Sequence, residues 1–116
     1  MQEKIDEERR RYVELLQKSV EVIVEKLRDK VERISLIGSY PRRADLFTDL
    51  DVLIVMKTEK NFLERVREIY SLLSLPVDAD IICYTPENLR KMKNSSFLRK
   101  ALENEVVLYE RFSQRR

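Results

Sequence analysis

The sequence predicts an α/β or α+β domain, in which a small mixed β-sheet is flanked by helices and preceded by a long N-terminal helix. Short apolar runs alternate along the chain with segments in which apolar residues recur every three or four positions, as in buried strands and amphipathic helices. The connections are short, and 116 residues are an ordinary length for one domain. No repeat, linker or low-complexity segment divides the chain. We therefore expect one domain over residues 1–116, with a helix over 1–30 and the core over 31–110.

The first element is a long amphipathic helix. Between Ile5 and Val31 one face is apolar and the opposite face carries Glu, Lys and Arg; the apolar residues are Tyr12, Leu16, Val20, Ile23 and Leu27. Leu15, Val22 and Val24 widen this stripe beyond what one sheet face needs. We prefer a helix that simply packs on the sheet to one that also contacts a partner protein.

Three apolar runs predict strands. Residues 34–37 form a short run that Gly38 and Ser39 close with a turn, and residues 39–48 follow as a basic loop or short helix. Residues 50–56 are apolar on both faces after Asp51, as in a central strand that is covered on both sides. Residues 79–84 form the third run.

The remaining segments predict helices and a last strand. Thr58 is expected to cap a helix that ends before Pro76 and has one apolar face, made of Phe62, Val66, Ile69, Tyr70 and Leu73. Thr85 and Pro86 predict the start of another helix, with Thr85 as the cap and Pro86 at the first helical position. A final helix over about 96–104 is expected to point Phe97, Leu98, Ala101 and Leu102 inward. For residues 106–109 we favour an edge strand over a continued helix.

Composition excludes several classes of protein. Lys and Arg total 23, Asp and Glu total 21, and the net charge is +2, so the interspersed charges argue against a polyanion-coating protein. The sequence shows no basic stripe with interleaved aromatic residues, which is the pattern that would indicate nucleic-acid binding. No apolar run reaches the roughly 20 residues of a membrane span, and the N-terminus lacks the apolar segment of a secretory signal. We expect a cytoplasmic protein.

Residue types that are absent or occur once exclude several kinds of catalytic and binding site. The chain has no histidine, and Cys83 is its one cysteine, which excludes His-dependent nucleophilic catalysis, His-rich zinc sites and an intrachain disulfide. Gly38 is the one glycine, so neither a Walker-type loop nor a dinucleotide fingerprint is present. Chemistry must use carboxylates, hydroxyls, Lys, Arg and a hard metal.

Paired acids supply the first candidate site. Asp49 and Asp51 are two positions apart at the start of a strand, so both carboxylates point to one face, with Cα atoms roughly 6–7 Å apart. Their mutual repulsion favours a bound divalent cation, and oxygen ligands suit Mg²⁺ or Mn²⁺ rather than zinc. For a bare pair of this kind, an exposed turn whose acids cap backbone groups is the favoured explanation.

A third acid strengthens the metal interpretation. Asp80 begins another apolar strand, where its neighbours suggest a buried setting, and it meets the pair if the two strands are adjacent. Three carboxylates can hold metal ions, or two can hold a metal while the third acts as a general base. Asp78 lies on the same strand face as Asp80 and competes for this role; we prefer Asp80 because it lies deeper in the strand.

Gly38 and Ser39 supply candidate donors for phosphate. A glycine lets the backbone approach a ligand closely, and backbone N–H groups together with a hydroxyl can cradle phosphate oxygens. Arg42 and Arg43 follow, and guanidinium groups pair well with a triphosphate. An ordinary turn with solvated arginines is the simpler explanation of each feature alone. Together with the acids, they describe phosphoryl transfer.

These residues resemble the signature of the DNA polymerase beta-like nucleotidyltransferase superfamily. Gly38–Arg42 (GSYPR) precedes Thr48–Val55 (TDLDVLIV), and Asp80 matches the later third carboxylate. The closing Glu105–Tyr109 (EVVLY) is similar to the ending of the small stand-alone members, the minimal nucleotidyltransferases. The resemblance covers about residues 31–110. Pro41 and Arg43 depart from the usual loop, the spacer before the acids is one residue short of that in typical adenylylating antitoxins, and Arg43 has no role in the motif.

The resemblance implies a nucleotidyltransferase-like fold and Mg²⁺- or Mn²⁺-dependent transfer of a nucleoside monophosphate to a hydroxyl acceptor. The expected substrate is ATP, which would supply AMP, and another NTP is the alternative. Gly38 and Ser39 would hold the triphosphate and Arg42 would assist. Asp49, Asp51 and Asp80 would form the metal and catalytic site, Asp80 alternatively as the base. Small members are often antitoxins that adenylylate a helical HEPN-type toxin.

Two other functions are compatible with the sequence. A binding module could neutralise a helical HEPN-type partner, with or without catalysis, and a homodimer is an alternative way of completing so small an enzyme. A receiver-type regulatory domain also has acids at strand ends, but its glycine-rich turns are not evident here.

Overall fold

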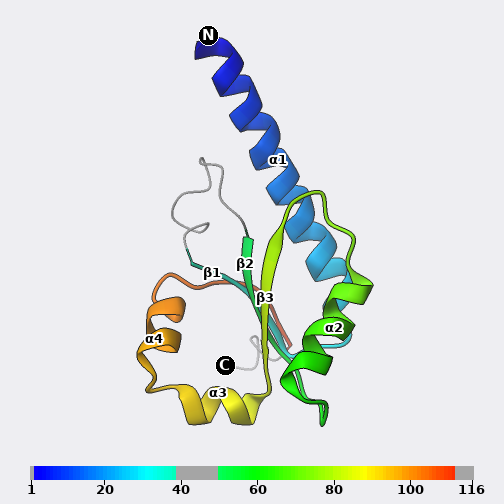
Figure 1. Ribbon diagram of the computed structural model, residues 1–116, viewed down its shortest axis with the longest axis vertical. Coiled ribbons are helices and arrows are strands. Elements are labelled where there is room, and N and C mark those ends of the chain that lie inside the picture. Colours follow the sequence, from blue (N-terminus) through cyan, green and yellow to red (C-terminus); the bar gives the residue numbers. More distant parts are fainter. Residues whose placement is uncertain (1, 39–49, 112–116) are drawn as a thin grey trace.

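The computed structural model describes residues 2–38 and 50–111, with side chains from residue 7 onward. Its elements, in chain order, are α1 (Gln2–Leu27), β1 (Arg33–Ile37), β2 (Leu50–Val55), α2 (Phe62–Leu72), β3 (Ala79–Tyr84), α3 (Pro86–Met92), α4 (Ser96–Leu102) and β4 (Val106–Glu110). The four strands form one sheet in the order β3-β2-β1-β4 (Figure 1). β1 is antiparallel to both β2 and β4, whereas β2 and β3 are parallel. The predicted mixed sheet flanked by helices is confirmed.

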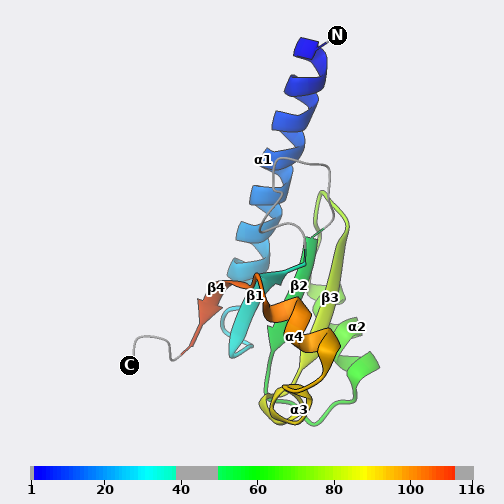
Figure 2. The same ribbon diagram turned by 90° about the vertical axis from the view of Figure 1, so that its left-hand side faces the viewer.

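Helices cover both faces of the sheet. α1 and α2 lie on one side of it and α3 and α4 on the other (Figures 1 and 2). On the first side, α1 and α2 bury a continuous apolar cluster against alternate strand residues; its members include Leu16, Ile23, Leu27, Ile34, Leu36, Val52, Ile54, Ile69, Ile81 and Cys83. On the other side Ile37 and Leu53, together with Leu98 of α4, are buried. β2 is therefore a central strand that is covered on both faces, as predicted.

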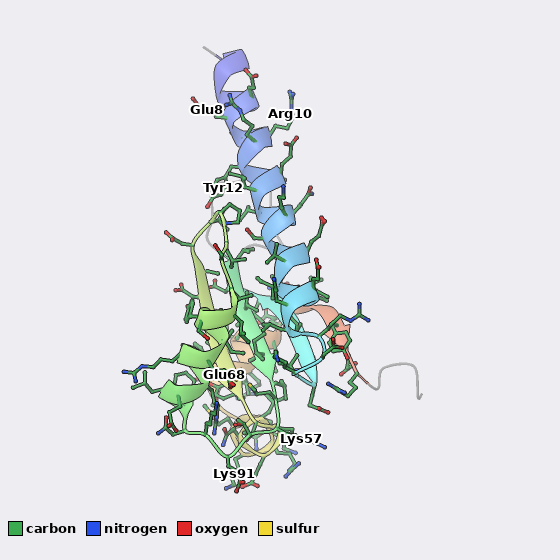
Figure 3. All side chains as sticks on the ribbon, turned by 90° about the vertical axis from the view of Figure 1, so that its right-hand side faces the viewer. Glu8, Arg10, Tyr12, Lys57, Glu68 and Lys91 are labelled. Carbon is green, nitrogen blue, oxygen red and sulfur yellow. The ribbon has the colours of Figure 1, made fainter. Side chains whose placement is uncertain are left out.

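α1 confirms the predicted long helix and extends past the sheet (Figure 1). Its C-terminal half buries Leu16, Ile23 and Leu27, while Glu8 and Arg10 point outward from the projecting turns (Figure 3). Of the residues that widen the stripe, Val24 packs on the core, whereas Leu15 is 39% exposed. Within the described residues, no helix has the length and apolar character needed to cross a membrane.

One predicted helix cap is confirmed by the structure and another is wrong. Thr85 Oγ1 accepts a hydrogen bond from the Asn88 N–H at 3.0 Å and caps α3, with Pro86 as the first helical residue, as predicted. α2 is capped by Asn61 rather than by Thr58. Asn61 Oδ1 accepts from the Glu64 N–H, and the Glu64 carboxylate accepts from the Asn61 N–H; this reciprocal pair satisfies two N–H groups that the single Thr58 hydroxyl cannot reach together.

Two aromatic side chains lie differently from the prediction. Phe97 was expected in the core but is 57% exposed, because α4 buries Leu98 and the next residue round a helix points about 100° away. On α2, Ile69 is buried and Val66 and Leu73 pack on the core, while Phe62, the first residue of the helix, is 48% exposed. The last segment is the edge strand that was favoured, β4.

Candidate functional site

Asp51 and Asp80 are direct partners in the sheet. They face each other in the parallel ladder of β2 and β3, where neighbouring strands run about 4.8 Å apart. Directly paired residues project their side chains from the same face, and both line a cavity beneath α4. The two carboxylates therefore lie side by side at one end of the sheet.

Gly38 lies against Asp51. The residue before it, Ile37, pairs with Asp51 in the antiparallel ladder of β1 and β2. Gly38 has φ +76°, and a Cβ at this position would overlap Asp51 Oδ2 and lie 3.2 Å from Asp51 Cγ. Both the left-handed backbone and the close approach require glycine. The turn after β1 therefore brings bare backbone up to the carboxylate, as the glycine count suggested.

A cavity of about 580 Å³ opens over these residues. Strand and turn residues line one side of it, namely Ile37, Gly38, Asp51, Asp80 and Ile82. α4 and the turn after it supply the other wall, with Phe97, Lys100, Ala101, Glu103 and Asn104. Its size lies within the range of small-molecule sites.

A larger hollow of about 800 Å³ lies at the opposite end of the sheet, next to Val55. Its basic and acidic residues balance, and Arg33 there is already paired with Glu105 at 3.2 Å and with Glu110 at 3.8 Å. Because the three acids that line this hollow are each paired with an arginine, whereas Asp51 and Asp80 face each other, we place the candidate site in the smaller cavity.

The structure separates the two candidates for the further acid. Asp80 lines the cavity that contains Asp51, whereas Asp78 precedes β3 and lines only a neighbouring hollow, next to Tyr70 and Val77, which Asp80 also borders. The expectation of a buried Asp80 is wrong: the residue is exposed, because β3 is an edge strand of the sheet. An exposed acid at the mouth of a cavity remains accessible to a soluble ligand.

Tyr70 of α2 holds the open edge of β3 beside Asp80. Its hydroxyl donates to the Ala79 carbonyl at 2.7 Å and accepts from the Ile81 N–H at 3.2 Å. These two backbone groups flank Asp80 on the side of the strand that faces away from β2. The tyrosine thereby takes the place of a neighbouring strand at this point of the edge.

Four residues named from the sequence, Asp49, Ser39, Arg42 and Arg43, lie outside the described residues. Within residues 2–38 and 50–111, no three acidic or Cys side chains come together as a metal site. The described donors are the oxygens of Asp51 and Asp80. This set fits Mg²⁺, which proteins commonly hold through one or two carboxylates together with substrate phosphates.

Sequence reasoning missed the wall that α4 contributes. The sequence pattern predicts Phe97 in the core and gives no role to Lys100, Glu103 or Asn104. A signal for them exists: Phe97, Lys100, Ala101 and Asn104 recur at spacings of three and four, which defines a second helix face beside the one that carries Leu98.

Comparisons with known proteins place the chain by its fold. No family model matches the sequence, and no curated protein matches it. A crystal structure of a Sulfolobus solfataricus protein, provisionally assigned as a nucleotidyltransferase, superposes with a TM-score of 0.57 at 22% identity, over 92% of this chain and 87% of that one. A chain of a MntA–HpeT toxin–antitoxin variant superposes with a TM-score of 0.51 at 16% identity, over 85% and 75% of the two chains. This protein shares its fold with these two structures, which agrees with the nucleotidyltransferase-like fold that its sequence predicted.

Proposed function

We propose that the protein is a metal-dependent nucleotidyltransferase that moves a nucleoside monophosphate, in the first instance AMP from ATP, to a hydroxyl acceptor. The observation that carries this proposal is the direct pairing of Asp51 with Asp80, with the Gly38 backbone packed against Asp51. The shared fold supports it independently.

The carboxylates of Asp51 and Asp80 would hold Mg²⁺, and Asp49 would add a third oxygen donor. The bound ion would neutralise negative charge on the phosphates. Without a cation, two neighbouring carboxylates repel each other. In the reaction the acceptor oxygen bonds to the α-phosphorus, the bond from that phosphorus to the bridging oxygen breaks, and pyrophosphate leaves. The acceptor proton passes to a base, which would be Asp80 in the alternative arrangement where Asp49 and Asp51 alone hold the ion.

A transfer assay with matched carboxylate variants tests the proposal. The full chain is incubated with Mg²⁺, ATP labelled in its α-phosphate and a lysate of the source cells as acceptor pool, and both incorporated label and released pyrophosphate are measured. We expect Asp51→Asn and Asp80→Asn to lower transfer at least 100-fold, on the order of one lost transition-state interaction. Asp78→Asn removes an equal charge beside a different hollow and should retain activity. Transfer that survives in both site variants would refute the proposal.

A second function has its own support. On α1, Leu15 is 39% exposed although its neighbour Leu16 is buried, and one structural neighbour comes from a toxin–antitoxin. Both favour a module that binds and neutralises a helical partner of the HEPN type. Co-expression with the product of the adjacent gene discriminates the two functions: a stable complex with undetectable ATP binding favours this second function.

A further inference from the structure

α4 presents two faces with different tasks. Leu98 is 1% exposed and anchors the helix on the sheet, and Ser95 Oγ accepts from the Leu98 N–H at 3.0 Å, which fixes where the helix begins. Phe97, Lys100 and Ala101 form a neighbouring face that lines the cavity of Asp51 and Asp80. Phe97 and Lys100 are three residues apart and so lie about one turn apart along the helix, roughly 4.5 Å in rise.

Lys100 is a cation in a cavity that is otherwise acidic. The described charged residues that line it are Asp51, Asp80, Glu103 and Lys100, and the ammonium of Lys100 makes no ion pair with a described side chain. A metal-bound triphosphate carries charges of both signs. Its cation suits the paired carboxylates, and its free oxygens suit an ammonium. Lys100 is therefore placed for the phosphates that the acids alone would repel.

Phe97 presents an aromatic ring at the same cavity. The side chain lines the cavity and is 57% exposed. The flat face of a nucleobase stacks on such a ring whatever the base. Stacking would also remove apolar surface of the ring from water.

We propose that this face of α4 holds the nucleotide, with Lys100 contacting the triphosphate and Phe97 stacking on the base. The assignment rests on the proposed function and names residues that the sequence signature does not include. It makes nucleoside triphosphates the ligand class. Phe97 supplies affinity for a base without selecting which base.

Calorimetry on the full chain with Mg²⁺ tests the two contacts separately, with a non-hydrolysable ATP analogue and with tripolyphosphate as probes. Lys100→Met should weaken binding of both probes roughly ten-fold or more, since a charge-assisted hydrogen bond is lost. Phe97→Ala should weaken binding of the ATP analogue roughly ten-fold or more and leave tripolyphosphate unchanged, because only the analogue carries a base. Lys100→Arg and Phe97→Trp should restore most of each loss.

Matched controls come from the same chain. Arg99→Met removes a charge from α4 at a residue that does not line the cavity, and Phe62→Ala removes a half-exposed ring from α2, on the other side of the sheet. Both should bind as the wild type does. Both test residues are exposed, so thermal unfolding midpoints should change little in any variant.

The outcomes separate this inference from the function on which it rests. If the wild type binds the analogue and both Lys100→Met and Phe97→Ala bind it equally well, the α4 assignment is wrong, while the carboxylate variants still decide the transferase. If Phe97→Ala weakens tripolyphosphate as much as the analogue, the stacking role is wrong. If the wild type binds neither probe, the proposed function itself fails.

Discussion

The carboxylate of Asp51 occupies the space that a side chain at Gly38 would need. A Cβ built on Gly38 overlaps Asp51 Oδ2 and lies 3.3 Å from Asp51 Cβ, and the backbone there has φ +76°. Two constraints therefore act on one residue: a left-handed turn after β1 and direct contact with a candidate site acid.

Gly38→Ala should destabilise the protein by about 1–3 kcal/mol, from backbone strain together with the displaced carboxylate. The free energy of unfolding in urea measures this cost. Repeating the substitution in an Asp51→Ala background separates the two causes, because the overlap with the carboxylate is gone while the strain at φ +76° remains. Equal costs in both backgrounds would show that the Asp51 contact contributes nothing.

Tyr70→Phe should loosen the edge of β3 around Asp80. The substitution removes the hydroxyl that bonds to the Ala79 carbonyl and the Ile81 N–H, and we expect a loss of about 1–2 kcal/mol. Amide hydrogen exchange should accelerate at Ile81. Ser71→Ala is the control, because the Ser71 hydroxyl donates within α2 to the Glu68 carbonyl and touches no strand. Unchanged protection at Ile81 would contradict the role assigned to Tyr70.

Magnesium should raise the thermal unfolding midpoint of the wild type, and chelation should reverse the rise. Binding to the folded state alone stabilises it by about 1.4 kcal/mol when the free ion is ten times its Kd. Asp51→Asn and Asp80→Asn should abolish the shift, since each removes one of the paired donors. In the absence of metal Asp80→Asn should be no less stable than the wild type, because a like-charge repulsion is relieved.

Asp78→Asn provides the comparison for the magnesium experiment. Asp78 lies outside the cavity of Asp51, so this variant should keep the full shift of the midpoint. A shift lost equally in all three variants would indicate weak attraction of cations to general surface charge rather than a site.

Stability should fall between about pH 9 and pH 11 because of Cys83. Burial raises the pKa of its thiol from 9.0 to about 11, with Arg65 opposing the rise and Glu68 adding to it. In this window the unfolded chain has released the thiol proton and the folded chain retains it, so the folded state loses stability as pH rises. The contribution is fully present below the unfolded pKa and amounts to on the order of 2 kcal/mol.

Cys83→Val removes this titration and suits the strand position. Its unfolding free energy should fall less between about pH 8 and about pH 10.5 than that of the wild type, while the titration of other groups is common to both chains. Identical pH profiles would show that the thiol ionises as easily in the fold as in the unfolded chain.

Local patterns in the sequence predicted much of the fold. The three-to-four spacing of Leu16, Ile23 and Leu27 located the buried stripe of α1, and the Thr85–Pro86 cap located α3. These signals are carried by neighbouring residues, so they can be read before any partner segment is known. The Thr58 cap was wrong because Asn61 with Glu64 offers the better reciprocal pair.

Some features of the candidate site could likewise be predicted from the sequence, and others could not. By itself the sequence determined which acids begin strands and that one glycine follows β1, because alternation and residue type are local properties. Only the tertiary structure decided that Asp80, not Asp78, shares a cavity with Asp51, that Asp80 is exposed, and that Phe97 and Lys100 face the acids. Strand order, ladder register and the docking of α4 set those relations, and each depends on contacts between segments far apart in the chain.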